Sequence, residues 1–168
     1  SESWLFKELG DMHWQMITNG LQCPSSELAD GNGNRLYATF TKISLRSKAL
    51  VHYAENSELA LQGSIFRYGG GIFLSDIELN GGSASLMSSF SMRGESGSNV
   101  SLLKGQPSIP DNCNIGVLSS LPEFGQDYRK IRAAPLPVSI FECDYDLIPQ
   151  YDLNGVGLLY FAAYPMIS

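Results

Sequence analysis

The feature that most limits how this chain can fold is a change in the spacing of its apolar residues near residue 34. Before that point, apolar side chains recur every three or four residues. After it, apolar and small polar residues alternate in successive runs, and glycine-rich turns at 69–71 and 80–82 separate some of these runs. Alternation is typical of strands that bury one face, and short turns join antiparallel neighbours. The pattern predicts four antiparallel strands, at 36–46, 58–68, 72–79 and 83–93.

The start of the chain predicts one amphipathic helix from about Ser3 to Gly20. Its apolar residues follow spacings of four, three and four: Leu5, Leu9, Met12 and Met16. A helix followed by a meander of strands predicts an α+β fold, in which the helix covers the apolar face of the sheet. His13 lies in this helix, and His52 is the only other histidine. We therefore expect His13 in the core rather than in a catalytic pair.

The remaining residues give weaker signals. Residues 94–136 are rich in glycine and proline and are predicted to form a long connection. Near its end lies the one basic cluster of the sequence: Arg129, Lys130 and Arg132. These cations are either a solvent-exposed loop or a contact for the phosphate of a nucleotide handle or carrier-protein arm. Further on, 138–143 predicts a strand and 158–167 predicts the start of an apolar helix.

Charge and cysteine content exclude several classes of protein. The chain has 11 Lys and Arg against 17 Asp and Glu, a net charge of −6, so nucleic-acid binding is not expected. No apolar run is long enough to span a bilayer, and the N-terminal residues lack a signal-peptide pattern. Cys23, Cys113 and Cys143 are isolated, which favours neither disulfides nor a metal site. We expect a cytoplasmic protein without membrane contact.

Two groups of motifs carry a resemblance to known families. The run Tyr160-Phe161-Ala162, preceded by Asp152-Leu153-Asn154-Gly155, resembles the start of the helix in hot-dog thioesterases. In those enzymes an Asp precedes the glycine, and alignment on the Tyr-Phe-Ala motif places that Asp at the position of Asn154. Further blocks are similar to bifunctional acyltransferase/decarboxylases of polyketide biosynthesis, of the leinamycin-pathway type: 4–5 with 9–14, 34–40, 86–91 and 102–107.

This resemblance implies a double hot-dog protein, in which each unit wraps an antiparallel sheet around a long helix. Residues 1–136 would form the first unit with its connecting loop, and 137–168 the truncated beginning of a second unit. A missing second half or a partner subunit would then cover the apolar residues of 158–167. The family decarboxylates methylmalonyl-CoA and transfers the propionyl group to an acyl carrier protein. The coenzyme A thioester is the substrate, and no cofactor is implied.

The resemblance also implies a catalytic tyrosine. An essential tyrosine in the family falls on Tyr37, which either carries the acyl group or donates a hydrogen bond to the developing enolate. Thr39 and Thr41 share its face by strand alternation and are candidate substrate-binding residues. Asn154 keeps the shape of the hydrolase Asp, donates hydrogen bonds and avoids repelling a substrate carboxylate.

Two alternatives stay open at this point. One is a non-catalytic hot-dog module for docking or dimerisation within a larger assembly. The other is a hot-dog acyl-CoA thioesterase or dehydratase, which Asn154 disfavours because hydrolysis needs a carboxylate at that position.

Overall fold

The computed structural model describes residues 2–47, 54–94, 101–136 and 138–167. His52 lies outside the described residues. The chain has an α+β fold that begins with a 20-residue helix, α1 (Glu2–Leu21). Four long strands follow it: β1 (Tyr37–Ser47), β2 (Leu61–Tyr68), β3 (Ile72–Leu79) and β4 (Gly82–Arg93). The predicted helix and four strands are thus confirmed.

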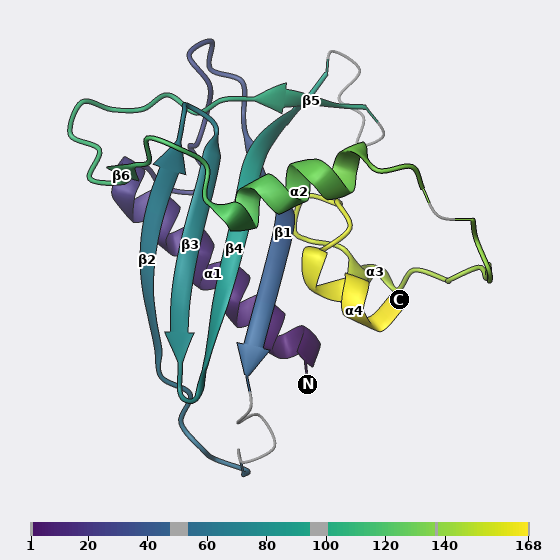
Figure 1. Cartoon of the computed structure of the whole chain (residues 1–168). Coiled ribbons are helices and arrows are strands. Elements are labelled where there is room, and N and C mark those ends of the chain that lie inside the picture. The colour runs from purple at the N-terminus through teal and green to yellow at the C-terminus, as the bar shows by residue number, and fades with distance from the viewer. Residues whose placement is uncertain (1, 48–53, 95–100, 137, 168) are drawn as a thin grey trace.

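The strands form one sheet with α1 on one face. The sheet order is β1-β4-β3-β2-β6, and the four long strands pair antiparallel. The short β5 (Leu102–Gly105) pairs antiparallel with β4, while β6 (Gly116–Val117) pairs parallel with β2. In Figure 1, α1 crosses behind the sheet and a second helix, α2, crosses in front of it.

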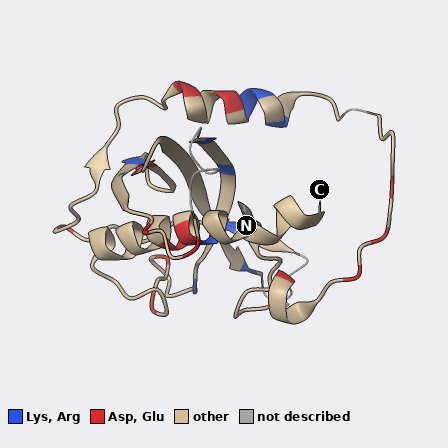
Figure 2. Cartoon of the chain, turned by 90° about the horizontal axis from the view of Figure 1, so that it is seen from below, with Lys and Arg blue, Asp and Glu red and all other residues tan. Residues whose placement is uncertain are grey.

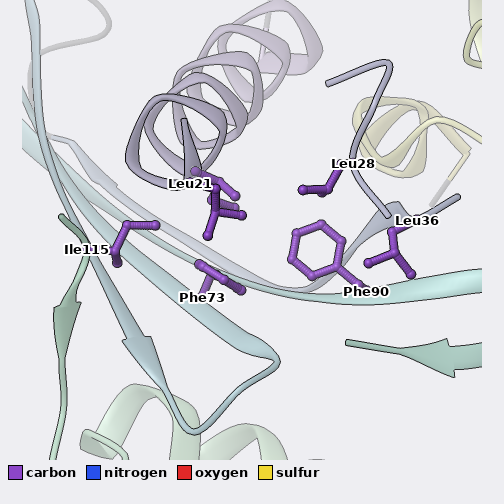
Figure 3. Close-up of a cluster of buried hydrophobic side chains, with 7 residues drawn as sticks. Leu21, Leu28, Leu36, Phe73, Phe90 and Ile115 are labelled. Atoms are coloured by element: carbon purple, nitrogen blue, oxygen red, sulfur yellow. The ribbon is translucent and has the colours of Figure 1, made fainter. Parts of the chain in front are cut away.

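The core lies between α1 and the sheet. One cluster of apolar side chains fills the end near the helix C-terminus (Figure 3): Ile17, Leu21, Leu28, Leu36, Phe73, Phe90 and Ile115. The buried stripe of α1 differs from the predicted one, since it recurs every four residues: Leu5, Leu9, His13, Ile17 and Leu21. Met12 and Met16 flank this stripe and are half-buried, because the centre of the helix face follows the i, i+4 row.

His13 is the polar residue at the centre of this core, as expected from the sequence. Its side chain is fully buried, with Nδ1 2.7 Å from Ser75 Oγ and Nε2 2.8 Å from Ser88 Oγ. Its ring packs against Phe40, with centroids 5.3 Å apart. Burial without a charged partner lowers the pKa of His13 from 6.5 to about 3. The imidazole is therefore neutral at physiological pH, and its two ring nitrogens hydrogen-bond to the two serine hydroxyls.

We expect this histidine to make stability depend on pH between about 6.5 and 3. Below 6.5 the unfolded chain binds a proton that the native core rejects, so each pH unit removes about 1.4 kcal/mol of unfolding free energy. The contribution of the neutral His13 to the unfolding free energy is fully present above pH 6.5 and is lost as the pH falls toward 3. Denaturant titrations at pH 7.5, 6.5 and 5.5 measure the slope. His13→Gln keeps hydrogen-bonding groups but does not titrate, so it should flatten the slope; equal slopes in both proteins would contradict the assignment.

A β-bulge divides β1 into two parts. The pairing of β1 with β4 shifts register between Phe40 and Lys42, and the Thr41 hydroxyl donates to the Met87 carbonyl at 3.0 Å. A one-residue shift exchanges the two faces of a strand. Even-numbered apolar residues therefore face α1 before the bulge and odd-numbered ones after it: Ala38 and Phe40, then Ile43 and Leu45.

The region predicted as a long connection contains an eleven-residue helix, so the prediction is wrong for α2 (Glu123–Ala133). Phe124 and Tyr128, one turn apart, pack with Leu121 against the outer face of the sheet. This apolar stripe is too short to stand out among the prolines that surround it. Lys42 fixes the helix to β1, because its ammonium group donates to the Phe124 carbonyl at 3.0 Å.

The predicted strand at 138–143 is also wrong. This segment has no regular secondary structure and pairs with no strand among the described residues, and Ile140 is 100% and Phe141 78% exposed. An alternating sequence alone does not make a strand, because a strand must also pair with the edge of a neighbouring strand. Further on, α3 (Pro149–Asp152), η2 (Phe161–Ala163) and α4 (Tyr164–Ile167) are single turns rather than one apolar helix.

The C-terminal segment nevertheless packs against α1. Ser3 Oγ donates to the Ala162 carbonyl at 2.6 Å, and the Phe161 ring lies 4.2 Å from that of Phe40. Gly10 permits this contact, since a Cβ atom there would overlap the Phe161 ring. Division of the chain into two units at residue 137 stays a prediction. Across the described ranges, no helix combines the length and apolarity needed to cross a membrane.

Candidate functional site

A cavity of about 670 Å³ lies beside the first part of β1. In the sheet, β1 pairs only with β4 among the described strands, which leaves its other edge open. Three parts of the chain provide most of the cavity lining: α1 near Gly10, β1 with the residues just before it, and the segment from Asn154 to Phe161. Figure 1 shows this C-terminal segment beside β1, although more than a hundred residues separate the two in sequence.

Tyr37 and Thr39 contribute to the β1 wall of this cavity. They precede the bulge and point to the sheet face opposite α1, as the alternation predicted. Two guanidinium groups lie near the Tyr37 ring, that of Arg35 at 5.5 Å and that of Arg93 at 5.1 Å from its centroid. Its hydroxyl has no hydrogen-bond partner among the described residues, whereas Thr39 Oγ1 lies 2.8 Å from Ser91 Oγ. The Tyr37 phenol is therefore available to a ligand.

Asn154 lines the same cavity from the other side. Its carboxamide oxygen accepts hydrogen bonds from the backbone N–H of Val156 at 3.1 Å and of Leu158 at 2.9 Å. Arg93 ties this loop to the sheet, since it donates to the Val156 carbonyl at 2.6 Å. The loop therefore orients the asparagine, and its NH₂ group remains as the donor that can meet a ligand.

Other candidate residues do not reach the cavity. Thr41 sits in the bulge, where its hydroxyl is bonded to the Met87 carbonyl, and the register shift turns it away from Tyr37. The basic cluster lies on α2, along the outer face of the sheet: Arg129, Lys130 and Arg132. All three side chains are exposed, and Figure 2 shows the basic residues of this helix gathered toward its C-terminal half. Arg129 stacks over the Tyr68 ring at 6.0 Å.

Three cavity residues were not predicted from the sequence: Asp11, Arg35 and Tyr160. The Asp11 carboxylate is paired with Lys7 at 2.7 Å. Burial raises the pKa of Tyr160 to about 12, and the Asp11 carboxylate adds to the shift, so this phenol stays protonated. Arg35 and Tyr160 lie within the motifs that carry the family resemblance, but alternation gives no means to place them at a cavity.

The described part of the chain has no candidate metal-binding site. No group of three or more His, Cys, Asp or Glu side chains lies close enough together there to hold a metal ion.

Comparison with known proteins does not identify the chain. It matches no protein-family model and no curated protein. The function must therefore be argued from the cavity itself.

Proposed function

We propose that this protein is a hot-dog acyltransferase/decarboxylase, which removes CO₂ from methylmalonyl-CoA and transfers the propionyl group to an acyl carrier protein. The observation that supports this proposal is the cavity where Tyr37, Thr39 and Asn154 meet, although Asn154 is far from the other two in sequence. Its volume falls within the range of small-molecule sites. The long helix against an antiparallel sheet is consistent with a hot-dog unit.

The proposed reaction has two steps. In the first, the bond between the α-carbon and the carboxylate breaks, CO₂ leaves, and the electron pair passes into the thioester carbonyl to give an enolate. A proton then adds to the α-carbon and gives propionyl-CoA. In the second step, the thiol of the carrier protein attacks the thioester carbonyl and coenzyme A leaves as its thiolate.

Hydrogen-bond donors aimed at the thioester oxygen would stabilise the enolate. Tyr37 and Asn154 each bring such a donor to the cavity, a phenol hydroxyl and a carboxamide NH₂. We assign Tyr37 the role of donor in preference to that of acyl carrier. A phenol must lose its proton to act as a nucleophile, and the described residues that line the cavity include no histidine and no unpaired carboxylate.

A thioesterase or dehydratase fits this cavity less well. Asn154 occupies the position of the hydrolase carboxylate, and its oxygen is already used by two backbone N–H groups. The other carboxylate of the motif, Asp152, is buried and accepts hydrogen bonds from the Ile148 N–H and the Tyr145 hydroxyl. It lines a separate cavity of about 400 Å³ and cannot activate water next to Tyr37.

The alternative of a docking module rests on a different observation. Between α2 and α3 the chain exposes several large apolar side chains: Leu136, Val138, Ile140, Phe141 and Leu147. Such exposure is typical of surfaces that another protein covers. A second hot-dog unit, such as that of a partner subunit, would cover them. This surface is compatible with the enzyme as well as with a non-catalytic module.

The cations of α2 would bind the phosphate that both substrates carry. Coenzyme A and the carrier-protein arm each carry a phosphate at the far end of a pantetheine chain. Arg129, Lys130 and Arg132 are exposed on the sheet face to which Tyr37 points, and Lys and Arg suit phosphate recognition.

The deciding experiment is incubation with methylmalonyl-CoA and a phosphopantetheinylated acyl carrier protein, followed by mass spectrometry of the carrier arm. The proposal expects a carrier-bound propionyl group. Free methylmalonic or propionic acid would instead indicate a thioesterase. Unchanged methylmalonyl-CoA and an unloaded carrier would favour the docking module.

A further inference from the structure

We propose that Arg35 binds the free carboxylate of the substrate, so that the cavity selects malonyl-type thioesters over simple acyl thioesters. This inference rests on the proposed function, because it assumes that the thioester lies against Tyr37. It assigns substrate recognition to a residue outside the catalytic pair of Tyr37 and Asn154.

Arg35 is the one cationic side chain that lines the cavity in the described parts of the chain. Its guanidinium lies 5.5 Å from the centroid of the Tyr37 ring, which holds it close to the phenol. Within those same ranges it forms no ion pair. Arg93, the other guanidinium near this ring, already donates to the Val156 carbonyl. Arg35 is therefore the guanidinium that remains open to an incoming anion.

The carboxylates nearest to Arg35 in sequence and in the cavity have other partners. Asp30 accepts hydrogen bonds from the backbone N–H groups of Asn32 and Asn34, at 2.9 and 2.8 Å, and from the Asn34 carboxamide at 2.9 Å. These bonds close the turn that leads into Arg35. Asp11, on the α1 wall, is paired with Lys7. An external carboxylate would thus meet an arginine that no carboxylate of the described residues neutralises.

The position of Arg35 favours a carboxylate over a phosphate. The malonyl carboxylate is attached to the carbon next to the thioester carbonyl, so it lies close to any group that contacts that carbonyl. The phosphate of coenzyme A is separated from the thioester by the whole pantetheine arm. With the thioester at Tyr37, the group within reach of Arg35 is the carboxylate, which guanidinium can bind through two parallel hydrogen bonds.

The contact between Arg35 and the substrate carboxylate should strengthen substrate binding without accelerating decarboxylation. The negative charge that Arg35 meets disappears as CO₂ leaves, so the interaction is stronger in the bound substrate than in the transition state. An interaction of that kind lowers KM without raising kcat. Because Arg35 is exposed at the cavity, water weakens the contact, and we expect an effect of about tenfold rather than the larger values of buried pairs.

The test compares Arg35→Gln with Arg46→Gln, a matched control near the other end of β1 that is exposed and does not line the cavity. Arg35→Gln should raise KM for methylmalonyl-CoA about tenfold without lowering kcat. Transfer from propionyl-CoA, which has no free carboxylate, should be unaffected. Arg46→Gln should resemble the wild type with both substrates.

An unchanged KM for methylmalonyl-CoA in Arg35→Gln would overturn the inference, as would an equal loss with propionyl-CoA. Calorimetric binding of the two thioesters separates this failure from that of the proposed function. If the wild type binds methylmalonyl-CoA but does not decarboxylate it, the proposed function fails. Arg35 recognition then stands if Arg35→Gln removes the preference for methylmalonyl-CoA over propionyl-CoA, and falls if that preference persists.

Discussion

Tyr37→Phe should slow decarboxylation of methylmalonyl-CoA by about 10²–10³-fold while leaving the fold intact. The substitution removes only the hydroxyl, which has no hydrogen-bond partner among the described residues, so no buried partner is left unsatisfied. The ring keeps its contacts with Arg35 and Arg93. What is lost is one donor to the enolate oxygen, an interaction made most strongly in the transition state. Single-turnover measurement of CO₂ release would give the rate directly.

Tyr68→Phe is the matched control for this prediction. Tyr68 ends β2, stacks under Arg129 and does not line the cavity, so loss of its hydroxyl should leave both steps at wild-type rates. The two roles open to Tyr37 separate in the second step. A donor tyrosine leaves some transfer in Tyr37→Phe, whereas an acyl-carrying tyrosine leaves none and forms a trapped adduct in the wild type. Wild-type rates for both steps in Tyr37→Phe would remove the residue from the mechanism.

The elements that could be predicted from the sequence are those whose own pattern is long and regular. The alternation in 83–93 extends over β4 beyond its first residue, and the glycine turns on either side of 72–79 delimit β3. The helical spacing from Leu5 to Met16 lies within α1. The placement of Tyr37 opposite Ala38 and Phe40 followed from the same alternation, because it lies before the bulge.

Features that depend on a neighbouring segment could not be predicted. Thr41 was expected to share the face of Tyr37, and an inserted residue, which no alternation reveals, turned it away. Residues 138–143 alternate like a strand but have no edge to pair with among the described residues. The cavity residues Arg35, Asp11 and Tyr160 come from segments that are distant in sequence, so their meeting is a property of the tertiary structure alone.

The asparagine of the C-terminal loop provides a test of reaction type as well as of rate. Asn154→Asp preserves an oxygen that can accept the N–H groups of Val156 and Leu158, so the loop should keep its shape. The substitution removes the NH₂ donor and places a negative charge in the cavity. We expect decarboxylation to slow by about 10²–10³-fold, because a donor is lost and the new carboxylate repels that of the substrate.

The same charge is the group that a hot-dog hydrolase uses to activate or orient water. The product of Asn154→Asp should therefore shift from carrier-bound propionyl toward free acid, which mass spectrometry of the carrier arm and of the small-molecule fraction would quantify. Asn154→Ser gives the reference, since it removes the NH₂ group without adding charge and should slow decarboxylation without raising hydrolysis. An Asp variant that still loads the carrier at the wild-type rate would show that Asn154 does not face the reacting carboxylate. In that case Asn154 would serve only to cap the loop through its two backbone hydrogen bonds.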